Sequence, residues 1–359
     1  MEGTMSRNSG DKVPTMVDVA RRAGVSPSTV SYAMTGARPI SEATRERIQQ
    51  AMLDLGYRPN VFARGLKSKR SHIIAVLFPK DERGMNLGSM EYIFGASDHA
   101  QNRGYHLLLW TSGAEELDDL AGLAQQGLVD GALLMEVRLD EPRVEVLRNS
   151  ELTFTMLGQT ADPGDLDYVD TDFDQCARLA VTHLADQGHR HLGFVHQDAA
   201  TIASGRGNAI RLRDGMLRAA QDVGVALTAL TCQSHIAGGR KAFAELLTAD
   251  PQATAVIAFN EQAVPGLMAA AVEHGWRIPE DFSVVSIDMP AQAALMTTPT
   301  MTTVGPVAAA MGKAATEMLI RRIEGQQLRG PSQALFDGEL VARASSGPAP
   351  STHRAVIHP

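Results

Sequence analysis

The sequence predicts an all-α N-terminal head with a helix-turn-helix layout, joined to a two-lobed α/β body of parallel sheets. Three observations support this prediction. Helical segments separated by glycine turns open the chain, apolar strand-like runs alternate with helical segments from Ser71 onward, and the charge changes sign near residue 70. A chain of 359 residues is too long for one compact core and suits two or three domains.

The head is predicted to contain three helices, which span residues 16–23, 27–34 and 41–55. Thr15 and Ser26 can cap the first two helices, and Pro27 fits the first helical position because its missing N–H has no partner there. Gly24 ends the first helix, since glycine accepts the left-handed backbone of a sharp turn. Two helices joined by such a turn form a helix-turn-helix, whose second helix enters the major groove of DNA.

The distribution of charge also favours DNA as a partner of the head. The whole chain has a formal net charge of -8, which argues against nucleic acid. Residues 1–70, however, carry twelve Lys and Arg against six Asp and Glu, a net charge of +6, and the remainder carries −14. A basic head on an acidic body suggests two separate roles, and an uneven solvated surface is the alternative interpretation.

The body is predicted to contain two sets of alternating strands and helices. The strand-like runs cover residues 73–78, 106–110, 131–135 and 153–157 in the first set, and 192–196, 255–259 and 284–287 in the second. The helical segments lie near residues 91–103, 115–126, 174–187, 207–223, 238–249 and 261–274. Continuous apolar strands between helices are typical of parallel sheets covered on both faces. Two such lobes bind a ligand between them, at the C-terminal ends of their strands.

Composition and motifs exclude several other classes. Cys176 and Cys232 are too few for a disulfide scaffold or a four-cysteine zinc site, and His189 and His191 are interpreted as loop histidines, so no metal or cofactor is expected. No apolar run approaches the ~20 residues of a membrane span, and the N-terminus is too polar for a secretory signal, which predicts a cytoplasmic protein. The absence of a Gly-x-Ser-x-Gly elbow or another catalytic set argues against an enzyme.

The head resembles the DNA-binding domain of the lactose/galactose repressor family of bacterial transcriptional regulators. The residues that carry the resemblance are Thr15 to Ser31, Ser41, Thr44-Arg45, Leu55 to Asn60 and Ala63 to Lys67. Weaker matches continue into the body at 278–288, 299–304 and 340–346. The resemblance implies a body similar to periplasmic sugar-binding proteins and a homodimeric repressor of a pseudo-palindromic operator. It also implies control by a small-molecule effector, a sugar or related polyol, which acts as an inducer or as a corepressor.

The resemblance assigns DNA contacts to the recognition helix, the helix starts and a hinge helix over 58–70. The candidate residues are Ser26, Pro27, Ser28, Thr29, Ser31, Tyr32, Thr44, Asn60, Ala63, Arg64, Leu66 and Lys67. Pro27, Ser28 and Tyr32 match positions that face base edges, although Tyr32 along the phosphates is an alternative. Leu66 matches a leucine that wedges into the minor groove and kinks the duplex. A basic linker is the alternative interpretation of the hinge.

The resemblance also assigns an effector site to the body. The candidates are Asp288, Arg211, Asn260, Phe78, Tyr92, Gln159, Asp172 and Arg213. Asp288 and Asn260 follow predicted strands. Arg211 and Arg213 both flank the position where the family has an arginine, so either can face the ligand. A structural role is the alternative for Phe78, Tyr92 and the other weaker candidates.

The predicted domain boundaries follow from these assignments. They are a disordered extension over 1–14, a DNA-binding domain over 15–57, a hinge over 58–70, an N-terminal lobe over 71–173 plus about 303–331, a C-terminal lobe over 174–302 plus about 332–346, and a flexible tail over 347–359. The tail has no leucine heptad, so a homodimer is expected rather than a coiled-coil tetramer. A transport-associated sugar-binding protein is the rival class for the body, but it needs an export signal and has no head.

Overall fold

The computed structural model describes residues 14–35, 38–57, 70–79, 85–112, 117–326 and 330–351. The chain divides into two compact units, Met1–Ser71 and His72–Pro359. The predicted extension and hinge therefore lie outside the described residues, except for Pro14 and Arg70. In the part of the chain that is described, no helix is long and apolar enough to cross a membrane.

The head contains the three predicted helices, which are α1 (Met16–Ala23), α2 (Pro27–Thr35) and α3 (Glu42–Leu55). Their shared core is small and apolar: Val19, Ala20, Val30, Ile48 and Ala51 are at most 3% exposed. Periodic apolar positions on each helix produce this core, because residues three and four apart share one helix face. The helix prediction for residues 16–55 is confirmed.

Local contacts fix the ends of the head helices. The Asp18 carboxylate accepts hydrogen bonds from the Thr15 backbone N–H and hydroxyl, at 2.9 and 2.6 Å. These bonds give the N-cap residue of α1 a partner inside the first turn of the helix. Gly24 ends α1 with a φ of 67°, the left-handed conformation expected of it. The Ser26 hydroxyl accepts the Thr29 backbone N–H at 3.1 Å, so Ser26 caps α2 as predicted.

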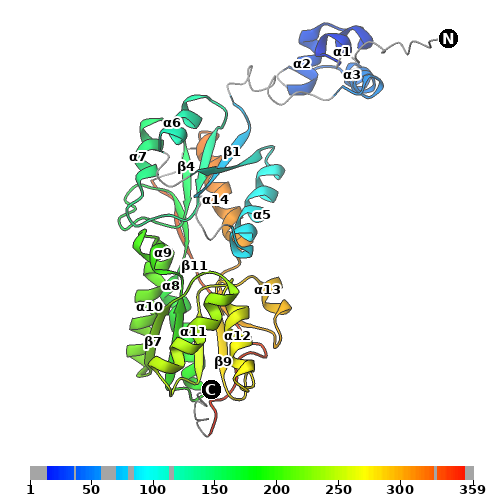
Figure 1. Cartoon of the computed structure of the whole chain (residues 1–359). Helices are drawn as coiled ribbons and strands as arrows, with labels where there is room; N and C mark the ends of the chain where they lie inside the picture. Colours follow the sequence, from blue (N-terminus) through cyan, green and yellow to red (C-terminus); the bar gives the residue numbers. More distant parts are fainter. Residues whose placement is uncertain are drawn as a thin grey trace, which may run out of the picture. The chain divides into compact units, whose positions relative to one another are not determined.

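The N-terminal lobe is built on a six-stranded, all-parallel sheet (Figure 1). The strand order is β11 (Gln333–Phe336), β5 (Tyr168–Thr171), β4 (Phe154–Leu157), β3 (Gly131–Leu134), β1 (Ile73–Pro79) and β2 (His106–Ser112). Alternate residues of β1 enter different cores: Ile74 and Val76 face α5 (Leu87–Asn102) and α14 (Ala308–Ile323). Ala75 and Leu77 face α6 (Leu117–Gln125) and α7 (Pro142–Asn149). Burial on both faces explains the continuous apolar runs.

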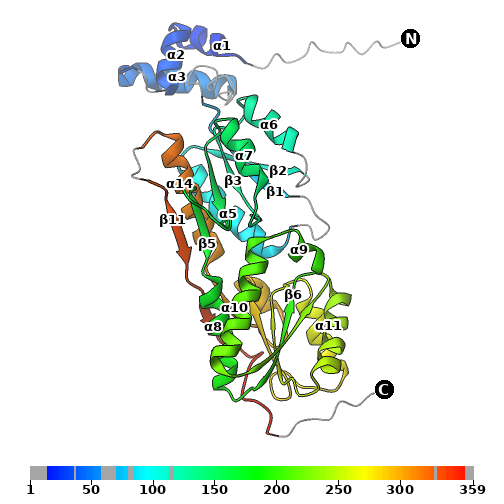
Figure 2. The ribbon, with the colours of Figure 1, turned by 90° about the vertical axis from the view of Figure 1, so that its left-hand side faces the viewer.

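The C-terminal lobe repeats this design. Its strand order is β12 (Glu339–Val341), β10 (Thr302–Gly305), β9 (Ser283–Ile287), β8 (Ala255–Ala258), β6 (His191–His196) and β7 (Ala226–Thr231), with only β12 antiparallel. One face packs against α11 (Ile236–Ala249) and α12 (Val264–Glu273), and the other against α8 (Phe173–Asp186) and α10 (Gly207–Val223) (Figure 2). The short helices α9 (Ala199–Ala203) and α13 (Ala291–Met296) complete the lobe.

The chain crosses between the lobes three times in the described residues: after β5, after β10 and after β11. The predicted boundaries near 303 and 332 are wrong by one strand. β10 pairs with β9 and so belongs to the C-terminal lobe, whereas β11 pairs with β5 in the N-terminal lobe. Hydrogen bonding to distant strands decides which sheet receives a four-residue strand, and no local pattern reports it.

The beginning of the predicted flexible tail is bound to the C-terminal lobe. The carbonyl of Gly347 accepts a hydrogen bond from His189 Nε2 at 3.1 Å, and its N–H donates to Ser283 Oγ at 3.1 Å. The Ala349 N–H donates to the carbonyl of Gln187 at 2.8 Å. The tail prediction is therefore wrong for residues 347–349, because buried polar groups of the lobe use the tail backbone as their partner.

Candidate nucleic-acid interface and ligand cavity

The start of α2 presents the polar groups expected at a nucleic-acid interface. Ser26, Pro27 and Ser28 are exposed, and Thr29 is half-buried with its hydroxyl 2.8 Å from that of Ser26. At the start of α3, Thr44 makes the same contact with Ser41, also at 2.8 Å. Helix starts offer free backbone N–H groups and a positive dipole end, both suited to phosphate oxygens.

Two recognition-helix residues lie in different surroundings. Tyr32 is half-buried, and the Arg38 guanidinium lies 5.3 Å from the centre of its ring, a cation–π contact that orients the ring. Ser31 is only 6% exposed. The predicted outward position of Ser31 is wrong, because α2 turns it inward together with Val30, whereas its assigned contact with DNA stays a prediction. The hinge candidates Asn60, Ala63, Arg64, Leu66 and Lys67 lie outside the described residues.

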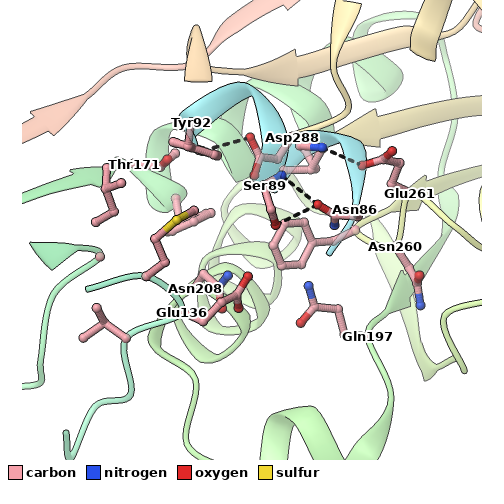
Figure 3. Close-up of a pocket in the computed structure, with 18 of the residues that line it drawn as sticks. Asn86, Ser89, Tyr92, Glu136, Thr171, Gln197, Asn208, Asn260, Glu261 and Asp288 are labelled. Atoms are coloured by element: carbon pink, nitrogen blue, oxygen red, sulfur yellow. Dashed lines mark hydrogen bonds between the residues drawn. The ribbon is translucent and has the colours of Figure 1, made fainter. Parts of the chain in front are cut away.

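A cavity of about 100 Å³ lies between the two lobes of the body (Figure 3). Polar side chains from both lobes line it. The N-terminal lobe contributes Asn86, Ser89, Tyr92, Glu136, Asp170 and Thr171, and the C-terminal lobe contributes Gln197, Asn208, Ser234, Asn260, Glu261, Gln262 and Asp288. Phe173, Phe259 and Met311 supply apolar wall. Five of the polar residues lie within three positions after the C-terminal end of a strand, as expected for open parallel sheets: Glu136, Gln197, Asn260, Glu261 and Asp288.

Asp288 is the most strongly perturbed acid of the cavity. It directly follows β9 with a φ of 57°, which turns its side chain out of the strand direction toward the other lobe. The Tyr92 hydroxyl donates to Asp288 Oδ1 at 3.3 Å and joins α5 to the C-terminal lobe. Burial, followed by the nearby charges of Glu261 and Glu136, raises the pKa of Asp288 to about 7, although the tyrosine hydrogen bond opposes the shift.

A second interlobe contact lies on the same side of the cavity. Glu261 Oε2 accepts the backbone N–H of Gly88 at 3.2 Å, which satisfies a free donor in the first turn of α5. Asn86 caps this helix and accepts from both the N–H and the hydroxyl of Ser89. Burial raises the pKa of Glu261. Figure 3 shows these residues around one wall of the cavity.

On the opposite side of the cavity, backbone hydrogen bonds join the two lobes. Arg138 and Arg206 form an antiparallel β-bridge, and the N–H of Leu139 donates to the carbonyl of Gly205 at 2.8 Å. Arg206 also forms a buried ion pair with Glu136. The two lobes therefore touch on both sides of the cavity, so an occupant that alters these contacts changes the relative position of the lobes.

The structure places three of the predicted effector residues in the cavity lining: Asp288, Asn260 and Tyr92. It does not place the other five there. Phe78 is 5% exposed in the core of the N-terminal lobe, and Asp172 caps α8 by accepting the Gln175 N–H. Arg213 pairs with Asp214, its side chain 41% exposed. Each of these predictions is wrong as a cavity assignment, because helix register and packing direct the side chain elsewhere.

Arg211 and Gln159 lie behind the cavity and support it. Arg211 donates to the carbonyls of Gln159 and Thr160 at 3.0 and 2.8 Å, and its guanidinium lies 3.7 Å from Asp170 Oδ2. Of the two alternatives, Arg211 is therefore nearer the cavity than Arg213, but it holds a loop of the other lobe rather than lining the space. Gln159 contributes its carbonyl to this contact.

The sequence reasoning missed several cavity residues, above all Glu136, Gln197 and Glu261. Each lies within three residues of the C-terminal end of a strand, at β3, β6 and β8. The rule that parallel sheets bind ligands at these ends was available from the sequence and would have selected them.

No group of three metal-binding side chains is found among the described residues. His189 and His191 have separate structural partners. His189 Nδ1 lies 2.8 Å from Thr254 Oγ1, and His191 Nδ1 lies 3.0 Å from Asp250.

Comparisons with known proteins agree with this architecture. Residues 15–60 match the model of bacterial regulatory proteins, lacI family, and residues 181–346 match that of the periplasmic binding protein-like domain. The chain is 30% identical over 316 residues to the HTH-type transcriptional repressor PurR of Vibrio atlanticus (strain LGP32), covering 86% of this chain and 92% of that protein. It is 28% identical to catabolite control protein A of Priestia megaterium, covering 76% and 82%.

Solved structures of similar proteins have the same architecture. The transcriptional regulator CelR in complex with cellobiose is 26% identical with a TM-score of 0.69, over 93% of this chain and all of that one. The lac repressor dimer bound to operator and the anti-inducer ONPF shares the fold, with a TM-score of 0.79 at 22% identity, over 94% and 100%.

A helix-turn-helix head on a two-lobed body with an interlobe cavity defines a ligand-responsive DNA-binding regulator. The chain belongs to the lacI family of bacterial regulatory proteins. It is a transcriptional repressor of this family rather than an enzyme.

Proposed function

We propose that the protein binds a pseudo-palindromic operator as a homodimer, and that a sugar or related polyol in the interlobe cavity controls its affinity for DNA. The observation that carries this proposal is the composition of the cavity wall, to which both lobes contribute hydrogen-bonding side chains. A repressor of chromosomal operators acts in the cytoplasm, where we expect this chain.

Polar chemistry supports a hydroxyl-rich effector. Asp288 and Glu261 accept hydrogen bonds, whereas Asn208 and Asn260 offer both donors and acceptors. Phe173 and Phe259 pack edge to face, with centroids 6.1 Å apart, and provide an apolar surface for a ring. Two similar regulators were solved with cellobiose and with ribose, which supports a carbohydrate here.

Contacts across the cavity support coupling to the head. Tyr92 and Gly88 of one lobe bind Asp288 and Glu261 of the other, so an occupant that replaces these partners changes the free-energy difference between two lobe arrangements. The chain leaves the N-terminal lobe toward the head just before β1, at residue 72. We propose that the lobe arrangement decides how two hinge segments meet on the operator.

Selection of DNA from a random duplex library tests the first part. The full chain is expected to enrich a sequence with two related half-sites, as the two-fold symmetry of a homodimer requires. Enrichment of no sequence would contradict operator recognition. Thermal-shift screening of a panel of sugars and polyols then identifies ligands, because a ligand specific for the folded state raises the melting temperature.

The second part is tested by anisotropy of labelled selected operator, with each ligand and with an Asp288→Ala variant. Release of DNA identifies an inducer, and tighter binding identifies a corepressor. The variant is expected to bind operator normally but to lose the response. An unchanged response in Asp288→Ala would place effector binding outside this cavity, and an operator affinity insensitive to every bound ligand would overturn effector control.

A further inference from the structure

The interlobe cavity is acidic. Four carboxylates line it, Glu136 and Asp170 from the N-terminal lobe and Glu261 and Asp288 from the C-terminal lobe. The described residues of its wall include no Arg, Lys or His. A phosphorylated or carboxylated ligand therefore meets repulsion on both sides of the cavity, without a cation in the wall to offset it.

Two of the four carboxylates have cationic partners behind the wall. Glu136 forms an ion pair with Arg206, which is only 6% exposed. Asp170 faces Arg211 at 3.7 Å. Their negative charge is therefore largely balanced by the protein itself.

The other two carboxylates are not balanced in this way. Glu261 accepts the Gly88 backbone N–H, and Asp288 accepts the Tyr92 hydroxyl, both neutral donors. No described Arg, Lys or His lies at ion-pair distance from either group. Glu91, the neighbour of Tyr92 on α5, adds a further negative charge that acts on both.

Buried acceptors without donors give a second, independent indication of the ligand. Gln197 is 8% exposed and lines the cavity, yet its Oε1 has no hydrogen-bond partner among the described residues. Figure 3 shows its side chain directed toward the cavity from the wall opposite Asp288. Asp170, 4% exposed, also has no hydrogen-bond donor at Oδ2, although the Arg211 guanidinium lies 3.7 Å from that oxygen and balances its charge. Buried acceptors without partners are rare, because each loses its water without replacement, so these two favour a ligand rich in donors.

We propose that the effector carries a protonated amine, as in an amino sugar, with its ammonium bound by Glu261 and Asp288 and its hydroxyls donating to Gln197 and Asp170. This inference rests on the proposed function, since it specifies the effector of the same cavity. An ammonium supplies three donors and the positive charge that the two carboxylates lack.

The protonation of Asp288 gives this proposal a pH dependence. Its pKa is raised to about 7 by burial and by Glu261, Glu136 and Glu91, and Tyr92 opposes the shift. Burial, followed by the charge of Asp288, also raises the pKa of the Cys176 thiol on α8. A cation binds the ionised carboxylate, so its affinity is expected to rise between about pH 6 and about pH 7.5, while the affinity of a neutral sugar stays nearly constant.

The test compares matched ligands by calorimetry on the full chain. The probes are D-glucosamine, D-galactosamine and D-mannosamine, each beside its neutral parent hexose and its N-acetyl derivative, with glucose 6-phosphate as the anion. At least one amine is expected to bind about tenfold or more tightly than both of its neutral partners at about pH 7.5, as a charge-assisted hydrogen bond predicts. Glucose 6-phosphate is expected not to bind.

A pair of variants separates this site from general attraction of amines to an acidic protein. Glu261→Gln keeps the shape and removes the charge, so it is expected to weaken binding of the amine far more than binding of its neutral parent hexose, and so to abolish the preference for the amine. Glu280→Gln, an exposed position on the same lobe, is the control and should keep the preference. If both variants lose the preference for the amine to the same extent, the inference is overturned.

The remaining outcomes are also decisive. If no amine binds, or if a neutral hexose binds as tightly as its amine, the inference is overturned. Release of operator by that neutral hexose would show at the same time that the proposed function stands. Failure of the proposed function has a different result, because operator affinity then responds to no ligand of the cavity.

Discussion

Replacement of Asp288 by asparagine is expected to stabilise the empty protein at neutral and alkaline pH. Asp288 accepts only the Tyr92 hydroxyl in the described structure, at 3.3 Å, and faces other carboxylates across the cavity. Asparagine has the same size, keeps an acceptor for the tyrosine and tolerates the φ of 57° at this position. The substitution therefore removes the charge and leaves the geometry.

The magnitude follows from the pKa of Asp288, which moves from 3.8 to about 7 on folding. Three units correspond to about 4 kcal/mol, and solvent screening at this partly exposed group reduces the expected effect to about 2 kcal/mol. Because the folded-state pKa is raised, the stability that protonation provides is fully present below about pH 4. It is lost as the pH rises through about 7. The advantage of Asp288→Asn should grow over the same interval.

Thermal unfolding of the full chain at about pH 4.5 and about pH 8 measures this difference. A body of this size gains about 2 °C per kcal/mol, so the variant should melt about 4 °C higher than the wild type at the alkaline pH and nearly equal to it at the acidic pH. Asp222→Asn, an exposed aspartate on α10, is the control and should show no such trend. A variant that melts lower at about pH 8, or a difference independent of pH, would refute the reasoning.

Three further changes test other parts of the molecule. Leu66→Ala should weaken specific operator binding far more than non-specific binding, because the family resemblance makes this leucine a minor-groove wedge; equal losses in an anisotropy titration would contradict that role. Gly312→Ala should lower the free energy of unfolding by about 1–3 kcal/mol, because a Cβ at this position would lie 2.0 Å from the Tyr92 carbonyl oxygen. Gly122→Ala is the control in the same melting experiment. The nearest atom that its Cβ would meet outside its own helix backbone is 3.9 Å away, so it should leave the stability unchanged. Ser345→Ala should lower the free energy of unfolding by about 1–3 kcal/mol, because its buried hydroxyl donates to the Val284 carbonyl at 2.6 Å and accepts the Thr302 N–H at 2.8 Å. Chemical unfolding measures this loss. An unchanged midpoint would show that the last segment does not stabilise the lobe.

The helices of the head could be predicted because their limits are local. Ser26, Gly24 and Gly56 act within one turn of the residues they cap or end, so the sequence contains the whole argument. The inward position of Ser31 could not be read in this way. A polar residue beside Val30 has the same local preference on either helix face, and contact with the other head helices decides which face is buried.

The strands of the body were predicted where they read as continuous apolar runs, whereas the short strand β5 is buried throughout but contains Asp170 and Thr171, and it was missed. β1, β3, β6 and β8 lie inside their sheets and read as continuous apolar runs. The edge strand β7 was missed because its residues are exposed or half-buried rather than buried.

The cavity was predicted in part, for a related reason. Asp288 and Asn260 lie within two residues of the end of a strand, and the ends of parallel strands meet at one edge of a sheet. Arg213 and Phe78 were misassigned because the direction of a side chain depends on helix register and on which core a strand residue faces.

The sequence by itself determined the kind of protein this is: a basic helix-turn-helix head, two parallel α/β lobes and the family to which they belong. These properties depend on residue spacing, capping and burial, which act over a few positions of the chain. Only the tertiary structure decided that β11 completes the first sheet, that residue 347 is held by His189, and that four carboxylates converge on one cavity. The first two pairings join residues more than a hundred positions apart and the carboxylates come from both lobes, so their free energy depends on distances that no local pattern records.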